Sequence, residues 1–277
     1  MAEKTLNARK ISEYFVRLEA EAKEPAFQEG VWRSFVSVWL LVTRIPLPAS
    51  LVASRRLPAA RDIAALPAAG AAFGFIAALP AWFLTFAAPA AASAWIACGL
   101  YVLLGWSLHL DGWGDLWDGF GSGRRGDAML AVMKDSRVGS FGVAGIVLAI
   151  AIRAALLADI DPMLWLFAAA TAGGIARFAL AVTAFWGKYP WPGGMGLDIV
   201  RNFDGYDLFL AFIVTCLLFP IAPLVWIIGI PLVSLASFGL ALWANKNLGG
   251  TNGDVLGASA VLGELLVLIV FAALPRG

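Results

Sequence analysis

Cysteine, histidine and net charge are all scarce in this chain. Two cysteines and one histidine occur among 277 residues, which is too few for a disulfide framework or a zinc site built from these residues. Cys98 and Cys216 both lie within apolar runs, so we interpret them as small buried hydrophobic residues. Charged residues make up only 14% of the chain and the net charge is +1. This balance gives no sign of a nucleic-acid-binding surface.

Apolar residues, in contrast, are abundant. They form 61% of the chain, and the mean hydropathy of +0.81 is too high for an ordinary soluble domain. Apolar runs of roughly 20 residues are typical of helices that cross a membrane. Such runs are found at 66–88, 91–108, 138–158, 163–186, 206–222, 224–243 and 257–274. We therefore predict an all-α polytopic membrane bundle of about seven spanning helices.

The first 52 residues are predicted to form a separate segment, with the transmembrane catalytic domain at 53–277. Residues 1–30 are polar and lack the apolar core of a signal peptide. Their apolar residues recur at roughly helical spacing, which favours an amphipathic helix on the membrane surface. These residues are Leu6, Ile11, Phe15, Leu18 and Ala22. Residues 31–52 contain arginines and prolines that leave too short an apolar run to span, so we expect an interfacial or re-entrant helix.

Basic residues divide unevenly between the predicted connections. The connections 53–65, 109–137, 187–205 and 244–256 contain ten lysines and arginines, whereas the opposite side has only Arg276. Basic connections of membrane proteins face the cytoplasm. We therefore expect the long connections and the N-terminus inside the cell, and the C-terminus outside.

Three aspartates directly follow the second apolar run. Asp111, Asp115 and Asp118 are separated by steps of four and three residues, which places the three carboxylates on one face of an α-helix. Because like charges repel, a divalent cation that prefers hard oxygen ligands, such as Mg²⁺, Ca²⁺ or Mn²⁺, is the simplest way to hold them together. The alternative is a solvated helix face without a ligand.

A second group of charges consists of Lys134, Asp135 and Arg137. Cations beside metal-binding carboxylates are the components that stabilise charge in phosphoryl transfer. Asp135 has either a catalytic role or an exposed ion pair with a basic neighbour. His109, the single histidine, is either a structural hydrogen-bond partner or a general base.

These two charged segments resemble those of the adenosylcobinamide-GDP ribazoletransferases, or cobalamin synthases, which are membrane enzymes of vitamin B12 synthesis. The segment HLDGWGDLWDG at 109–119 is similar to the family pattern HLDGxxDxxDG, and MKDSRVGSFG at 133–142 is similar to MxDSRxGxxG. The segment LVTRIPLP at 41–48 resembles the family's TRxPxP element. CDP-alcohol phosphotransferases also carry aspartates on a membrane helix, but their alanine-arginine pair is missing here.

Two further segments extend the resemblance. KYPWPGGMG at 188–196 resembles PxxxPxGMG, which implies that Gly194 belongs to a substrate-binding rim. LGGTNGDVLGA at 248–258 resembles GGxTGDxxGA and implies that Gly249, Gly250 and Asp254 bind substrate. The chain departs from the pattern at Asn252, where the family has threonine, and at Val261, where an acidic residue is common.

Charged residues also occur inside predicted spans, where a charge is costly and usually functional. Arg177 either contacts an anionic substrate or pairs with a carboxylate of a neighbouring helix, and Glu264 is a candidate for that partner. We class both among the substrate-binding candidates. Arg153 is a weaker case, because its long side chain can extend to the membrane boundary.

The resemblance implies a Mg²⁺-dependent transfer of the adenosylcobinamide-phosphate group from adenosylcobinamide-GDP to α-ribazole or α-ribazole 5′-phosphate, with release of GMP. Asp111, Asp115, Asp118 and Asp135 would bind the Mg²⁺, while Lys134 and Arg137 would add positive charge. The implied setting is the bacterial inner membrane, with the lipid bilayer as a partner and the active site facing the cytoplasm. Whether the protein forms a homo-oligomer stays open.

The alternatives are a CDP-alcohol-type phosphotransferase that acts on lipid and a cation transporter. A transporter would place its carboxylates near the middle of the membrane, between broken helices. The aspartates are instead predicted at one surface beside basic connections, which favours the enzyme.

Overall fold

The computed structural model of the protein describes residues 25–52, 58–105, 107–194 and 196–274. All regular secondary structure in these ranges is helical. The longer helices are α2 (Pro25–Val42), α4 (Leu66–Leu84), α5 (Ala90–Leu104), α6 (Leu108–Gly121), α8 (Ser140–Asp159), α9 (Trp165–Trp186), α11 (Gly205–Cys216), α12 (Pro223–Asn247) and α13 (Gly253–Ala272). The shorter elements are α3 (Ala49–Val52), η2 (Ala60–Ala65), α7 (Asp127–Met133), η3 (Pro162–Leu164), α10 (Gly196–Asn202) and η4 (Phe219–Ile221).

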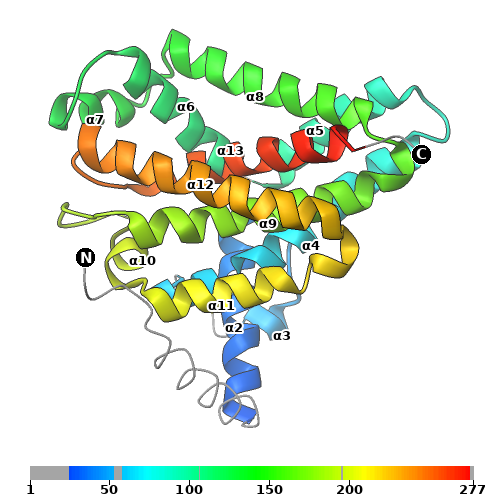
Figure 1. Ribbon diagram of the computed structural model, residues 1–277, viewed down its shortest axis with the longest axis horizontal. Coiled ribbons are helices and arrows are strands. Elements are labelled where there is room, and N and C mark those ends of the chain that lie inside the picture. Colours follow the sequence, from blue (N-terminus) through cyan, green and yellow to red (C-terminus); the bar gives the residue numbers. More distant parts are fainter. Residues whose placement is uncertain (1–24, 53–57, 106, 195, 275–277) are drawn as a thin grey trace.

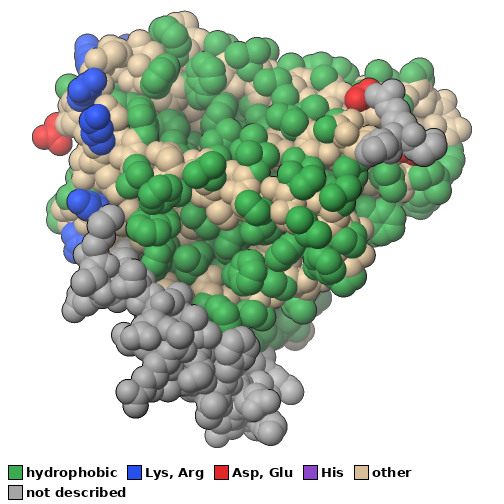
Figure 2. Space-filling view, in the orientation of Figure 1, with side chains coloured by type: hydrophobic (Ala, Val, Ile, Leu, Met, Phe, Trp, Pro, Cys, Tyr) green, Lys and Arg blue, Asp and Glu red, His purple; other side chains and the backbone are tan. Residues whose placement is uncertain are grey.

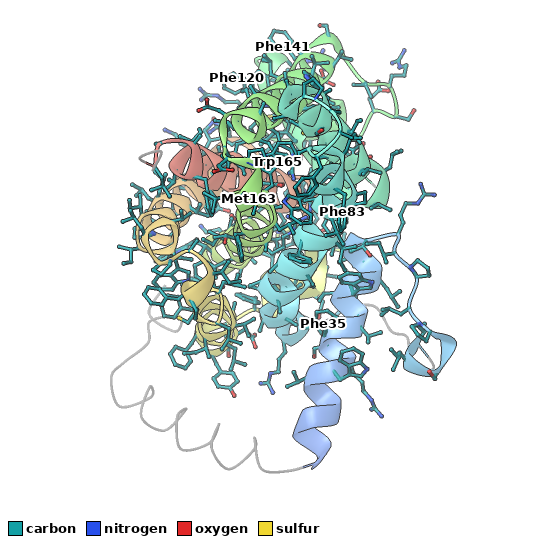
Figure 3. The ribbon with its side chains drawn as sticks, turned by 90° about the vertical axis from the view of Figure 1, so that its right-hand side faces the viewer. Phe35, Phe83, Phe120, Phe141, Met163 and Trp165 are labelled. Atoms are coloured by element: carbon teal, nitrogen blue, oxygen red, sulfur yellow. The ribbon has the colours of Figure 1, made fainter. Side chains whose placement is uncertain are left out.

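Helix α9 lies at the centre of the bundle. It packs against α4, α11, α12 and α13, and nearly all of its side chains are buried. Gly173 of α9 and Gly70 of α4 approach so closely that a Cβ atom on either residue would collide with the backbone of the other. Seen from one end, Trp165 lies among the surrounding helices, whereas Phe35 lies on α2 at the edge (Figure 3). Small residues therefore bring the central helices together, as is common in membrane bundles.

The sides of the bundle are apolar and one end is basic. Large hydrophobic side chains such as Phe83, Val147 and Leu235 are more than half exposed on α4, α8 and α12. Lysine and arginine side chains gather at the left end of the molecule in Figure 2, where α7 and α10 lie in Figure 1. An apolar belt and a basic end are the surface that a membrane-spanning protein needs.

Five helical segments are long and apolar enough to cross a membrane: Ala60–Leu84, Ser140–Asp159, Pro162–Trp186, Pro223–Asn247 and Gly253–Ala272. They coincide with five of the seven predicted spans. The other two predictions, 91–108 and 206–222, fall on α5 and α11. Each of these helices belongs to a bent pair, with 93° between α5 and α6 and 101° between α10 and α11. The polytopic helical class is confirmed, with five spans, or up to seven if each bent pair counts as one.

The segment 109–137 is not the connection that we expected from the sequence. It contains α6 and α7, and α12 likewise continues to Asn247, inside the predicted connection 244–256. Glycines give α6 a weak intrinsic helix propensity. Its packing against α8 and α13 compensates for this weakness. The sharp turn into α6 coincides with Ser107, whose φ of 57° is in the left-handed region.

Helix α2 runs across the direction of the other long helices (Figure 1). Its apolar part, Gly30–Val42, is shorter than a membrane span, in agreement with the expectation that 31–52 does not cross. Val38, Trp39 and Val42 bury this end of α2 in the core. The amphipathic helix predicted for 1–30 lies almost entirely outside the described residues, and the division at residue 52 stays a prediction.

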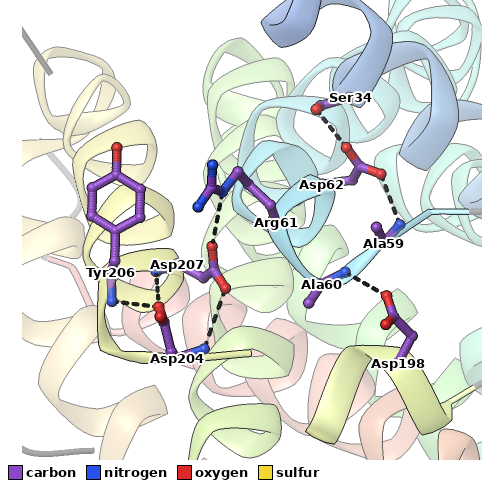
Figure 4. A network of polar contacts seen from close by, with 9 residues as sticks. All are labelled: Ser34, Ala59, Ala60, Arg61, Asp62, Asp198, Asp204, Tyr206 and Asp207. Atoms are coloured by element: carbon purple, nitrogen blue, oxygen red, sulfur yellow. Dashed lines mark hydrogen bonds and ion pairs between the residues drawn. The ribbon is translucent and has the colours of Figure 1, made fainter. Parts of the chain in front are cut away.

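A polar network fixes η2 against α2, α10 and α11 (Figure 4). The contacts are Ser34 Oγ to Asp62 Oδ1 at 2.5 Å, the Ala60 amide to Asp198 Oδ2 at 3.0 Å, and Arg61 Nε to Asp207 Oδ1 at 3.6 Å. Asp62 also accepts the Ala59 amide, which caps the start of η2. The network thereby holds η2 beside the end of α2, where both elements line a cavity next to the predicted site.

Candidate active site

The predicted aspartates lie on α6, which is pressed against α13 through two glycines. A Cβ atom at Gly112 would meet the Asp254 backbone at 2.8 Å, and one at Gly257 would meet the Cα atom of His109 at 3.2 Å. Only glycine permits this approach, which brings the predicted carboxylate of Asp254 next to the first turn of α6. Segments separated by more than 130 residues therefore form one site.

Negative charge accumulates at this contact. Asp115 experiences the charges of Asp254, Asp111 and Asp118, and Asp254 in turn experiences that of Asp111. The carboxylates of Asp111 and Asp115 have no hydrogen-bond or ion-pair partner among the described residues. Lys134 contributes a positive charge near Asp254. Within the described ranges, no three His, Cys, Asp or Glu side chains lie close enough to hold a metal ion together.

Asn252 organises the start of α13. Its side-chain oxygen accepts the Val255 amide at 3.0 Å as the N-cap, and its amide nitrogen donates to Asp254 Oδ2 at 2.8 Å. Asparagine thus serves as the cap where the family pattern has threonine. The departure that we noted in the sequence keeps the capping function and also orients Asp254.

Asp118 has a different environment from the other aspartates of α6. Its two carboxylate oxygens accept the backbone amides of Gly139 and Gly142, both at 2.7 Å, at the N-terminus of α8. A Cβ atom on either glycine would collide with this carboxylate. A negative charge at a helix N-terminus is favourable. Asp118 therefore connects α6 to α8 through both of its oxygens.

The second charged group forms an exposed pair after α7. Arg137 donates from Nε to Asp135 Oδ1 at 3.1 Å and from Nη2 to Oδ2 at 2.8 Å. The hydrogen bonds from the Arg137 side chain and backbone lower the pKa of Asp135 to about 2, and the same contacts raise the pKa of Arg137. Asp135 therefore stays charged at physiological pH. The Arg137 side chain is 87% exposed, so its charge faces solvent at the predicted site.

The two predicted substrate-binding loops lie together. The Thr251 amide donates to the Lys188 carbonyl at 2.7 Å, and Gly250 lies so close to Pro190 that no side chain fits between them. Gly194 and Gly249 have φ values of +118° and +82°, which strongly favour glycine. The predicted glycines thus shape the loops through their backbone.

Tyr189 is a residue of this loop that the sequence did not single out. Its hydroxyl donates to the Gly193 carbonyl at 2.9 Å. Burial is the main cause that raises the pKa of this phenol, and the negative charge of Asp254 raises it further. The electrostatic effect indicates that the 187–194 loop borders the carboxylates.

A second, buried group of charges lies deeper in the bundle. Arg177 donates to the Tyr101 hydroxyl at 2.6 Å, its Nη2 lies 3.3 Å from His109 Nδ1, and its Nη1 lies 3.9 Å from Glu264. Glu264 also forms an ion pair with Arg153. The suggested pairing of Arg177 with Glu264 is therefore confirmed, and His109 is hydrogen-bonded to a structural partner.

The expectation that Arg153 extends to the membrane boundary was wrong. Only 9% of the residue is exposed, and its guanidinium lies 3.7 Å from the centre of the Tyr101 ring. Burial places Arg153 beside a carboxylate and an aromatic face, which compensate its charge away from water. Tyr101 was missed because nothing in the sequence marks a tyrosine of an apolar run as a partner for distant arginines.

Comparison with known proteins gives a family. Residues 34–272 match the family described as Cobalamin-5-phosphate synthase. The chain belongs to this family. The range that matches the cobalamin-5-phosphate synthase family contains α6, α13 and the two predicted substrate-binding loops. All segments of the candidate site therefore lie within it.

Curated relatives support the assignment. An adenosylcobinamide-GDP ribazoletransferase of Clostridium kluyveri is 30% identical, over 87% of this chain and 96% of the relative. Proteins of the same name from Rhizobium meliloti and Bradyrhizobium diazoefficiens are 31% and 34% identical, over 86% and 66% of this chain and 95% and 71% of the relatives. No solved structure matches the chain.

Proposed function

We propose that the protein transfers the adenosylcobinamide-phosphate group of adenosylcobinamide-GDP to α-ribazole or α-ribazole 5′-phosphate. The products are GMP and adenosylcobalamin or its 5′-phosphate, at the end of cobalamin synthesis. Family membership supports this activity over a lipid phosphotransferase or a cation transporter. The structural observation that carries the proposal is the meeting of Asp111 and Asp115 of α6 with Asp254 of α13, beside Lys134.

In this reaction, a free ribose hydroxyl of the acceptor forms a bond from its oxygen to the phosphorus on the cobinamide side. This oxygen is not the 5′-oxygen, because in α-ribazole 5′-phosphate the 5′-oxygen carries the phosphate that the product retains. The bond from that phosphorus to the bridging oxygen breaks, and GMP leaves with this oxygen. The hydroxyl proton passes to a carboxylate of the site, since Asp111 and Asp115 have no hydrogen-bond partner among the described residues. Lys134 and Arg137 add positive charge where the transferring group becomes more negative.

The donor set at the α6–α13 contact suits a hard cation. Asp111, Asp115 and Asp254 provide carboxylate oxygens, which Mg²⁺ prefers, and their mutual repulsion favours a bound cation. No three carboxylates of the described residues lie close enough to share an ion, so one or two of these three residues would hold the Mg²⁺ together with phosphate oxygens of the substrate, the usual arrangement for this ion. Asp118 and Asp135 are the weaker candidates, because they are engaged by the start of α8 and by Arg137. When bound, the ion would neutralise charge on the pyrophosphate and on the departing GMP.

The test of the activity is a reconstituted reaction. Protein purified in detergent is mixed with Mg²⁺, adenosylcobinamide-GDP and α-ribazole, and chromatography follows GMP and the cobamide. We expect both products in equal amounts, and loss of both when the Mg²⁺ is chelated. GMP formed equally well without α-ribazole would make the protein a hydrolase, and an absence of both products under all conditions would contradict the proposal.

We further propose that the basic end faces the cytoplasm of a bacterial inner membrane, as the charge distribution supports (Figure 2). A Ser122→Cys variant, at the basic end, should react with an impermeant thiol reagent only after the inside of the cell is made accessible. Ala87→Cys, in the connection between α4 and α5, is the matched control for the opposite end and should react from outside. The reverse pattern would overturn the orientation.

A further inference from the structure

A cavity of about 140 Å³ lies beside the carboxylates, between α2, η2, α4, α10 and the starting turns of α6 and α13. Its polar side chains, His109, Asp111 and Asp254, come from the α6–α13 contact. The other walls are mostly aliphatic. They include Val42, Ile63, Leu66, Leu180, Ile199 and Leu256. A cavity of about 150 Å³ with such walls can accept a benzene ring. This cavity is partly open and therefore suits one ring of an aromatic group whose polar part lies near the carboxylates.

A smaller cavity among the described residues does not suit such a ligand. It has a volume of about 60 Å³ and is lined by Arg153, Arg177 and Glu264 together with apolar residues. This volume suits a few water molecules rather than a bicyclic ring. His109 lines both cavities, so it connects the buried charges with the larger one.

The hydrogen-bonding state of His109 follows from its partner. A guanidinium can only donate, so the 3.3 Å contact from Arg177 makes His109 Nδ1 an acceptor. This leaves Nε2 as the ring nitrogen of His109 that can donate. Apart from the two carboxylates, His109 is the polar side chain that lines the cavity.

These walls distinguish between the two bases that enter the proposed reaction. The acceptor α-ribazole is a benzimidazole nucleoside. Its base has one unsubstituted ring nitrogen, which accepts a hydrogen bond, and no hydrogen-bond donor. Guanine has several donors and acceptors along its edge. Asp111 and Asp254 can accept from its N–H groups, but apart from His109 the lining side chains offer no donor for its O6 and N7 acceptors. Unpaired buried polar groups strongly disfavour binding. The cavity therefore matches the base of the acceptor rather than that of the donor.

We propose that this cavity binds the benzimidazole ring of the acceptor nucleoside, with His109 Nε2 donating to the unsubstituted ring nitrogen and the ribose beside Asp111 and Asp254. The assignment rests on the proposed function and adds a specific acceptor subsite to it. It also gives Arg177 a positioning role, because the guanidinium fixes the tautomer of His109. Selection of benzimidazole over purine acceptors follows from the aliphatic walls.

The test places one extra methylene in the cavity. Val42→Leu extends a lining side chain, and we expect the KM for α-ribazole to rise about tenfold, the effect of a misplaced methylene in an apolar pocket. The KM for adenosylcobinamide-GDP should stay unchanged. Val38→Leu is the matched control: Val38 is fully buried one turn earlier on α2 and does not line the cavity. This control should lower the thermal stability without a selective change in the KM for α-ribazole.

A second variant covers the case in which Val42→Leu does not fold. Gly253 lines the cavity, and a Cβ atom there meets no atom within 4 Å, so Gly253→Ala should fold normally and weaken α-ribazole binding. Equilibrium dialysis of α-ribazole, without the donor, measures binding independently of the reaction. We expect adenosine and guanosine not to displace it.

Two results would overturn the subsite. One is a raised KM for adenosylcobinamide-GDP, or displacement of α-ribazole by guanosine, which would assign the cavity to the guanine of the donor. The other is an unchanged dissociation constant for α-ribazole in both folded variants. Failure of the proposed function would look different, because the parent would form no cobamide while α-ribazole binding stayed sensitive to Val42→Leu.

Discussion

Two groups of charges meet within one turn of α6, and they are organised in opposite ways. The group at Asp111 consists of carboxylates from α6 and α13 that repel one another, namely Asp111, Asp115 and Asp254. Asp111 and Asp115 have no hydrogen-bond or ion-pair partner among the described residues. At His109, the charges come from buried residues of opposite sign that contact one another: Glu264 pairs with Arg153 and Arg177. The same helix thus separates a group of like charges from a group in which one carboxylate partly compensates two arginines.

The difference indicates what each group is for. Unpartnered like charges lower the stability of the folded protein, so their presence favours a role in binding or catalysis. A buried ion pair contributes little net stability, but removal of one partner leaves a charge without compensation. We therefore expect changes at the first group to affect the reaction and changes at the second group to affect folding and the position of His109.

The largest effect is expected from Asp111→Asn and Asp115→Asn. Each variant keeps the size of the side chain but removes a charge that the Mg²⁺ and the phosphoryl group require, so kcat should fall by about 10²–10³-fold or more. Loss of a mutual repulsion should leave the melting temperature equal or higher. Kinetics and thermal unfolding in detergent measure both quantities.

The matched control for these variants is Asp127→Asn, an exposed carboxylate on α7 near the same end of the bundle. It should retain parental kcat. Near-parental turnover in Asp111→Asn or Asp115→Asn would show that the carboxylate in question has no part in the chemistry.

The second effect concerns stability. Glu264→Gln removes the carboxylate that compensates Arg153 and Arg177, which are both buried, and should lower the free energy of unfolding by about 3–5 kcal/mol. Denaturant unfolding in detergent measures the loss. If the stability stayed at the parental value while activity disappeared, Glu264 would belong to the substrate-binding group after all.

Asp118→Asn distinguishes a connection between helices from a metal ligand. The amide has one acceptor oxygen where the carboxylate has two, so one hydrogen bond to the α8 N-terminus is lost, at a cost of about 1–2 kcal/mol in stability. We expect a smaller loss of kcat than in Asp111→Asn. Equal losses of kcat in the two variants, with unchanged stability, would return Asp118 to the set of Mg²⁺ ligands.

The smallest effect is expected at the exposed pair after α7. Arg137→Lys keeps the charge but loses the two-pronged contact with Asp135 and the planar fork that could donate to a phosphoryl group. We expect kcat to fall about tenfold with a nearly constant KM, the pattern of an interaction made mainly in the transition state. A parental kcat with a raised KM for adenosylcobinamide-GDP would move Arg137 from catalysis to binding.

The sequence predicted the helical class, five of the spans and the segments of the site, because apolar length and charge spacing are local properties. It also placed Asp111, Asp115 and Asp118 on one helical face. It nevertheless treated 109–137 as a connection and did not predict the two helices α6 and α7 that fill most of it, since the intrinsic helix propensity of a glycine-rich segment is low. The helix depends on contacts with α8 and α13, which are distant in the chain.

The partners of each charge were equally hidden. Asp111 and Asp118 have the same residue type on the same face, yet one faces Asp254 and the other caps α8. Arg153 resembled a residue near a membrane boundary until the packing of α8 against α13 placed it beside Glu264. No spacing rule distinguishes these cases, because each depends on which helix lies opposite.

The sequence by itself thus determined where helices form in an apolar solvent and which residue types could carry phosphoryl-transfer chemistry. Only the tertiary structure decided which carboxylates stay unpaired, which arginine holds His109, and where a cavity remains beside them. The physical reason is the range of the interactions: hydropathy and helical periodicity act over a few residues. Ion pairs, caps and cavities instead form between segments that the packing of small residues at α4, α6, α9 and α13 brings together.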